Sequence, residues 1–242
     1  MKLILVHAVA MTRELGRYPA YIVPTLCFPT AFFVFFVVPS AGPFATVKMA
    51  AFAGFAAIGV AFFQFGVGIA MERASPWEAY LRTLPVAVAQ RLAARVLSAA
   101  VFAVAAAGVL VVVAVGATDA ALPFNRWLAL AFVLLAGTIP FALLGTALGY
   151  WMPERGALPI ANLLYLGLSY AGGLWIRPRD LPAPIQAVSA YLPTRALGDA
   201  LTAVVYTNRF TPRPWLALLG FGLAFAFLAA WGYRRDEGRR FR

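Results

Sequence analysis

Charged residues are scarce in this chain of 242 residues: they make up 12% of it, whereas 63% of it is hydrophobic. A soluble domain typically carries about 25% charged residues. So few charges could not cover a surface that faces water. The composition therefore excludes a soluble globular protein and predicts an all-α integral membrane protein.

The residues that most often build catalytic and metal sites are nearly absent. The chain has one histidine, His7, and one cysteine, Cys27, which excludes a His-pair metal site, a Ser-His-Asp set and an intrachain disulfide. The only lysines are Lys2 and Lys48, and neither follows a glycine, so the chain has no P-loop and cannot be a P-loop ATPase by itself. No enzymatic activity, metal or cofactor is expected of this chain.

Acidic residues in the middle of apolar runs are also missing. Glu72 and Glu154 lie at predicted membrane edges, whereas ion-coupled transporters usually keep an ionisable group at depth. This disfavours a secondary carrier. The net charge of +11 raises the question of nucleic acid, but the charges cluster at the ends of apolar runs and in the tail. That placement is typical of topology signals and contacts with anionic lipid, so no nucleic-acid partner is expected.

Six uncharged runs are long enough to cross a membrane, which needs about 20 mostly apolar residues. We expect spans at about 20–39, 49–71, 96–118, 127–151, 156–176 and 214–233. With the N-terminus inside the cell, thirteen of the 20 lysines and arginines lie on the inner side. The positive-inside rule therefore predicts that both termini are cytoplasmic.

Two stretches outside the spans are apolar but too short to cross. Residues 1–18 mix basic and apolar positions and predict an interfacial helix on the inner leaflet; a disordered leader is the alternative. No cleavable signal peptide is expected. Residues 178–212 are rich in proline, with a second helical pattern from Thr194 to Tyr206, and predict a pair of re-entrant or interfacial helices on the outer side.

The segment Glu72–Val86, between the second and third spans, predicts a short amphipathic helix. Ser75 is a good N-cap, Pro76 occupies the first helical position, and Glu78 completes a capping box. Pro85 ends the helix. One face is apolar and another carries an i,i+4 ion pair; these faces consist of Trp77, Tyr80, Leu81 and Leu84, and of Glu78 and Arg82. Such a helix can rest on lipid, cap the bundle or dock on a partner.

The spans themselves contain few polar side chains. Gln64, Thr138, Asn162 and Ser169 predict either interhelical hydrogen bonds or a mildly polar translocation path. The neighbouring aromatic residues predict either ordinary packing or a pocket for an apolar substrate; they are Phe62, Phe63, Phe65, Tyr165 and Tyr170. The Gly145-x-x-x-Gly149 motif predicts close helix packing, with an oligomer contact as the alternative.

Three stretches of the chain resemble ABC-2-type permeases, the membrane subunits of ATP-binding-cassette exporters. They are the Glu72–Val86 segment, Pro159–Tyr165 with Gly172–Ile176, and Leu181-Pro182, Gln186 and Tyr191–Thr194. The resemblance covers nearly the whole chain. It departs at Pro76-Trp77-Glu78, where relatives often carry Gly-Thr/Trp-Leu/Glu, which leaves the docking contacts of that helix undetermined.

The resemblance implies a single transmembrane domain over 1–242, of the type V exporter kind, in a bacterial-type inner membrane. It implies two copies of a separate ATPase that bind ATP and Mg, and a second permease that is the same chain or a paralogue. It assigns coupling to the ATPase to Glu72, Arg73, Ser75, Trp77, Glu78, Tyr80, Leu81, Arg82 and Leu84. We expect the substrate path to include Phe62, Phe63, Gln64, Phe65, Asn162, Tyr165, Ser169 and Tyr170.

The expected function is export of a hydrophobic or amphipathic substrate such as a drug, an antibiotic or a lipid. The alternatives are a permease for polysaccharide, a self-sufficient channel or secondary carrier, and a membrane scaffold without transport. The sequence does not identify the substrate.

Overall fold

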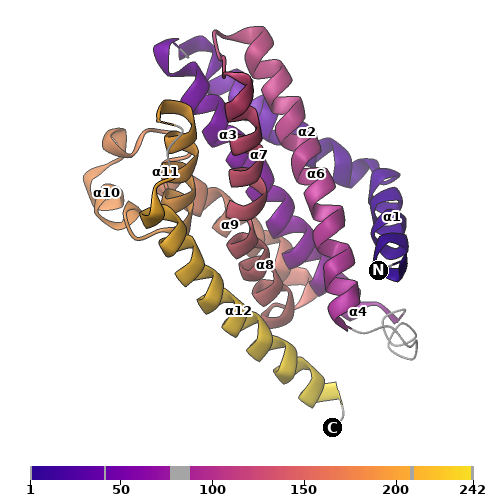
Figure 1. The fold of residues 1–242 in the computed structure, drawn as a ribbon. Helices are drawn as coiled ribbons and strands as arrows, with labels where there is room; N and C mark the ends of the chain where they lie inside the picture. Colours follow the sequence, from indigo (N-terminus) through magenta and orange to yellow (C-terminus); the bar gives the residue numbers. More distant parts are fainter. Residues whose placement is uncertain (1, 41, 77–87, 208–209, 241–242) are drawn as a thin grey trace.

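The computed structural model describes residues 2–40, 42–76, 88–207 and 210–240, and these residues form a bundle of helices without a β-strand (Figure 1). Five helical stretches of this described part are long and apolar enough to cross a membrane: 19–40, 42–74, 90–117, 124–151 and 212–237. The predicted all-helical membrane class is therefore confirmed. The sixth span and the placement of each helix relative to the bilayer remain predictions.

The first two helices lead into the bundle. Helix α1 (Lys2–Gly16) packs against α6 (Val88–Ala117), and α2 (Pro19–Phe36) follows it after a short turn. Two 3₁₀ turns, η1 (Val38–Ser40) and η2 (Gly42–Phe44), follow α2 before the next helix begins.

A continuous helical rod forms the centre of the bundle. It consists of α3 (Ala45–Ala61), the π-helix η3 (Phe62–Val67) and α4 (Gly68–Ala74). In its most apolar window 83% of residues are buried, against 17% in α2 and in the last helix, α12 (Pro212–Arg240). Small residues explain this position, because alanines and glycines along α3 allow neighbouring helices to approach closely.

The predicted fourth span is broken in the structure. Helix α7 (Phe124–Gly137) ends at Thr138, and α8 (Ile139–Trp151) starts there. Pro140 sits in the first turn of α8, where its missing N–H costs no hydrogen bond, and the Thr138 hydroxyl donates to the Leu134 carbonyl at 2.8 Å. An apolar run alone does not reveal such a break.

The predicted fifth span, 156–176, differs from the helix that the structure shows. Helix α9 (Glu154–Ala171) ends five residues earlier, at Gly172-Gly173, where Gly173 has a φ of +81° that strongly favours glycine. It is absent from the five candidate spans of the described part because it begins with Glu154-Arg155 and contains Pro159 and Asn162.

The segment after α9 folds back against the bundle. It contains η4 (Pro178–Asp180), α10 (Ala183–Ser189) and α11 (Pro193–Tyr206), which agrees with the short helix expected from Thr194. Leu197 and Leu201 of α11 are fully buried between α3 and α7, beside Gly54 and Gly137. The two glycines allow this close packing of α11, because a Cβ at Gly54 would lie 2.7 Å from the Leu201 Cδ1 and one at Gly137 would lie 2.5 Å from the Leu197 Cδ1. The ends of these leucines would then have to shift.

The Gly145-x-x-x-Gly149 motif forms a contact between two helices of this chain. A Cβ atom at Gly149 would lie 2.7 Å from the Ile69 Cβ and 2.8 Å from the Phe65 carbonyl oxygen. At Gly145 it would lie 2.9 Å from the Ala61 carbonyl oxygen. The motif therefore brings α8 against the central rod, which confirms the predicted close helix packing.

Candidate functional site

The last turn of α4 carries two neighbouring charged residues, Glu72 and Arg73, that contact different helices. The Arg73 guanidinium forms an ion pair with Asp236 of α12 and donates to the Gly149 carbonyl of α8 at 2.6 Å. It also lies over the Tyr150 ring, 5.6 Å from the ring centroid. Asp236 is only 8% exposed, so Arg73 ties α4 to α8 and α12 through a largely buried charge pair.

Glu72 forms an ion pair with Arg95 of α6. The two partners differ in exposure: the Arg95 side chain is 7% exposed, whereas the Glu72 side chain is 45% exposed. Arg95 also donates to the Gln64 carbonyl at 2.7 Å. The absence of a side chain at Gly68 leaves room for this arginine, because a Cβ there would lie 3.1 Å from its Nη1.

Gln64 adds a second contact with α6 and connects this arrangement to one further helix, α1. It lies in the π-helix η3, and its amide nitrogen is 3.1 Å from the Ser98 hydroxyl and 3.8 Å from the Met11 sulfur of α1. π-Helical turns are rare and occur frequently at functional sites. Gln64 is 3% exposed, so it supplies one of the few polar contacts inside the apolar bundle.

We name Glu72, Arg73, Arg95 and Asp236, together with Gln64, the α4-end cluster. It joins α4 to α6, α8 and α12, and through Gln64 it also contacts α1. The ends of α4 and α12 and the start of α6 lie toward one end of the bundle (Figure 1). A shift of the α4 end must therefore move these helices or break charge pairs that are costly to break when buried.

The residues predicted to couple this chain to an ATPase fall in two groups. Glu72 and Arg73 belong to the α4-end cluster, and Ser75 ends α4 with an extended backbone, φ −75° and ψ 135°. The other six lie outside the described residues, so their helix remains a prediction; they are Trp77, Glu78, Tyr80, Leu81, Arg82 and Leu84.

The structure brings most of the predicted path residues together where α9 packs on the central rod. The Tyr165 ring stacks on Phe55 at a centroid distance of 4.5 Å, and its hydroxyl donates to the Phe55 carbonyl at 3.2 Å. The Phe63 ring lies 5.7 Å from that of Tyr165. Five of the predicted residues are buried, namely Phe62, Gln64, Phe65, Tyr165 and Ser169, whereas Phe63, Asn162 and Tyr170 are partly exposed.

The partly exposed residues border a larger group of rings. The Trp175 ring lies 5.3 Å from the Phe32 ring of α2, 5.3 Å from Phe55 and 6.0 Å from Tyr170. We name as the aromatic face four partly exposed rings that surround the stacked Phe55–Tyr165 pair: Phe32, Phe63, Tyr170 and Trp175. Phe32 and Trp175 contact Phe55, Phe63 contacts Tyr165, and Tyr170 contacts Trp175. This surface can contact apolar groups but holds no charge.

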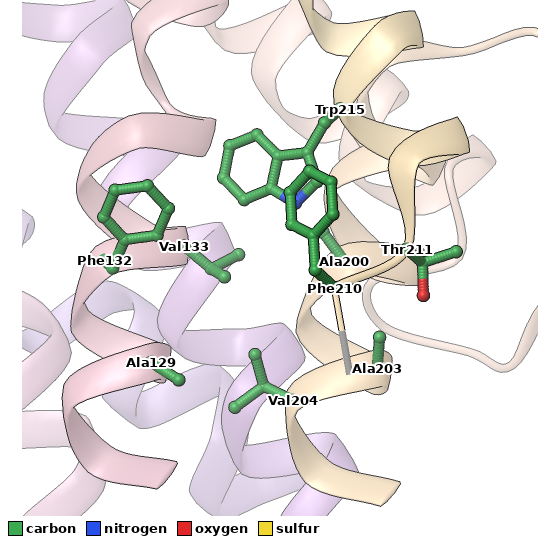
Figure 2. A pocket seen from close by; sticks show the side chains of 9 residues that line it. All are labelled: Ala129, Phe132, Val133, Ala200, Ala203, Val204, Phe210, Thr211 and Trp215. Atoms are coloured by element: carbon green, nitrogen blue, oxygen red, sulfur yellow. The ribbon is translucent and has the colours of Figure 1, made fainter. Parts of the chain in front are cut away.

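Two cavities of the described part lie elsewhere. One, of about 160 Å³, lies between α7, α11 and the start of α12 (Figure 2). Its walls are apolar apart from the Thr211 hydroxyl and the Trp215 indole nitrogen, and it is lined by Ala129, Phe132, Val133, Ala200, Ala203, Val204, Phe210, Thr211 and Trp215. None of these is a predicted path residue. A second cavity, of about 280 Å³, lies on α12 at Phe227, Ala230, Trp231 and Arg234.

Sequence reasoning missed two members of the α4-end cluster. It counted Arg95 only as a topology charge and gave Asp236 no role. Arg95 and Ser98 are three residues apart on one helix, and this spacing places both on the face that meets Gln64. Asp236 is an acidic residue among tail arginines. The spacing of Arg95 and Ser98 and the acidic character of Asp236 can be read from the sequence. Neither feature identifies the residue that each contacts on another helix.

Comparisons with known proteins agree with this architecture. Residues 40–231 match the family model described as "ABC-2 family transporter protein". The protein named "Putative transport permease YvfS" of Bacillus subtilis (strain 168) is 24% identical over 237 residues, which cover 96% of this chain and 97% of that protein. No solved structure matches the chain.

Proposed function

Because the chain belongs to the ABC-2 family of transporter proteins and is a transport permease, we propose that it forms the translocation path of an exporter driven by a separate ATPase. Two copies of that ATPase, which bind ATP and Mg, would act on a pair of permeases, either two copies of this chain or this chain and a paralogue. The complex would lie in a bacterial-type inner membrane with both permease termini in the cytoplasm.

The observation that carries this proposal is the α4-end cluster. Glu72 and Arg73 immediately precede the predicted coupling helix, and their ion pairs reach α6 and α12. A push on that helix from the ATPase would therefore be passed to helices on two sides of the central rod. Buried ion pairs suit this task because they have fixed partners and resist partial separation.

Replacing Leu81 by glutamate is expected to uncouple ATP hydrolysis from transport. A charge in the apolar stripe would disfavour docking in a groove of the ATPase, where it would lose its hydration. We expect ATP-driven efflux per ATP hydrolysed to fall at least about tenfold, which corresponds to about 1.4 kcal/mol. The measurement is dye efflux and phosphate release in proteoliposomes that contain the permease and its co-expressed ATPase.

Arg155→Gln is the control, because Arg155 is an exposed charge of the predicted inner side that is not assigned to coupling. Normal transport by Leu81→Glu would show that the coupling assignment is wrong. Solute flux from the purified permease alone, without ATPase or ATP, would instead favour the self-sufficient channel or carrier.

The aromatic face supports a hydrophobic or amphipathic cargo, such as a drug, an antibiotic or a lipid. Its rings are partly exposed, so an apolar molecule could stack on them. A polysaccharide would need a surface with more hydrogen-bonding groups than the described part of this face offers.

Replacing Phe63 by alanine tests this assignment. An aromatic pair contributes about 0.5–1.5 kcal/mol beyond its buried area, so we expect transport of rhodamine 6G at low dye concentration to fall by up to about tenfold. Phe124→Ala removes an equally large ring that is 83% exposed on α7, and it should leave transport unchanged. Equal losses in both variants would contradict a cargo contact at Phe63, and unchanged transport in Phe63→Ala would exclude it.

A further inference from the structure

The C-terminal half of α12 carries an apolar and basic stripe that remains largely exposed. Phe227, Trp231 and Arg234 are spaced at i, i+4 and i+7, which places them on one face of the helix. Phe227 is 69% exposed and Trp231 53% exposed, and their ring centroids lie 6.4 Å apart. These residues and Ala230 line the cavity of about 280 Å³.

The opposite face of α12 holds the helix to the bundle. The Trp151 indole donates to the Leu228 carbonyl at 3.1 Å, and a Cβ at Gly232 would lie 2.7 Å from that indole nitrogen. Asp236 is buried on this side by its ion pair with Arg73. Trp231 also contacts the bundle, because its ring packs edge-to-face on the Trp151 ring at a centroid distance of 4.9 Å. Phe227 and Arg234 are exposed, and Trp231 keeps 53% of its surface exposed.

The charge of the stripe has no counter-ion in the described part of the chain. Arg234 is exposed and forms no ion pair there, and the neighbouring Arg235 stacks over the Trp151 ring at 4.9 Å from the centroid. These arginines follow the predicted last span directly, at the depth where a membrane places its phosphate groups. Two cations therefore lie at the end of an exposed apolar helix face.

We infer that this stripe binds one anionic phospholipid. The phosphate would pair with Arg234, and the first methylene groups of an acyl chain would lie on Trp231 and Phe227. A lipid fits better than a protein partner or a soluble phosphate, because the apolar half of the site is continuous with a membrane-spanning helix and the basic half lies at its end. The bound lipid would also restrain the turn that carries Asp236, and thus the α4-end cluster.

The test is quenching of Trp231 by brominated lipids in detergent micelles that hold the full chain. The Trp231 signal is the difference between the chain and its Trp231→Phe variant. We expect phosphatidylglycerol to quench at lower concentration than phosphatidylcholine with the same brominated chains. Arg234→Gln should weaken the phosphatidylglycerol preference about fivefold, as expected for one arginine near an anionic surface. Arg234→Lys should retain most of it.

Arg213→Gln, at the other end of α12, should leave the preference at Trp231 unchanged. Equal quenching by the two lipids in the unaltered chain, or an unchanged preference in Arg234→Gln, would overturn the proposal. Displacement of the lipid by glycerol 3-phosphate would also overturn it, since the site would then recognise a soluble phosphate. The readout needs neither ATPase nor transport, so its outcome is independent of the proposed function.

Discussion

Replacing Glu72 by alanine is expected to lower the free energy of unfolding by about 3 kcal/mol, because it leaves the buried Arg95 cation without its counter-charge. Arg95 is 7% exposed and, among the described residues, would keep only the Gln64 carbonyl as an acceptor. For a chain of this size the loss corresponds to a fall in Tm of about 6–12 °C. Thermal unfolding of the detergent-solubilised protein, followed by circular dichroism, measures it.

Replacing the other partner of the pair, Arg95, should lower the free energy of unfolding much less. Arg95→Met removes the buried charge and keeps a long apolar side chain in its place, while the remaining Glu72 carboxylate is 45% exposed and can be hydrated. We expect a loss of about 1 kcal/mol, mainly from the missing hydrogen bond to the Gln64 carbonyl. Glu72→Ala combined with Arg95→Met should therefore be more stable than Glu72→Ala alone.

Asp199→Ala provides the control for this series, because it breaks a more exposed ion pair. In that pair the Arg195 side chain is 29% exposed and the Asp199 side chain is 49% exposed. Such pairs contribute about 0–1 kcal/mol. A double variant that is less stable than Glu72→Ala would contradict the buried-charge explanation. Equal effects of Glu72→Ala and Asp199→Ala would show that the Glu72–Arg95 pair has no special role in stability.

Replacing Asp236 by asparagine is expected to reduce coupled transport at least about tenfold while the chain still folds. The substitution keeps the shape but removes the charge that holds Arg73 to α12. Arg73 would keep its bond to the Gly149 carbonyl, so α4 would stay on α8 but lose its ion pair with α12. The measurement is the ratio of efflux to ATP hydrolysis, with both determined for the permease–ATPase complex in the same proteoliposomes.

Glu237→Gln is the matched control, because it neutralises the next residue, which accepts a hydrogen bond from Tyr233 within α12. It should leave the ratio of transport to ATP hydrolysis unchanged. If Asp236→Asn transports normally, the Arg73–Asp236 pair does not transmit the motion. If both variants lose transport equally, the effect arises from the charge of the tail rather than from this pair.

The short extent of α9 and the break at Thr138 show where local patterns failed. Hydropathy sums over residues and does not register that Gly173 adopts a positive φ, or that a proline two residues after Thr138 starts a new helix. The glycine motif in α8 was read correctly, because small residues at four-residue spacing favour close packing wherever the partner lies. Its partner, the central rod, could not be named from the sequence.

The sequence by itself determined the membrane class and the apolar stretches, because these depend on composition and on neighbours along the chain. Only the tertiary structure decided which charges are buried. Arg95 looks like a topology signal in the sequence, yet it lies inside the bundle because Gly68 leaves space and Glu72 supplies a counter-charge. Asp236 meets Arg73 across 163 positions of sequence, and such contacts arise only when helices pack.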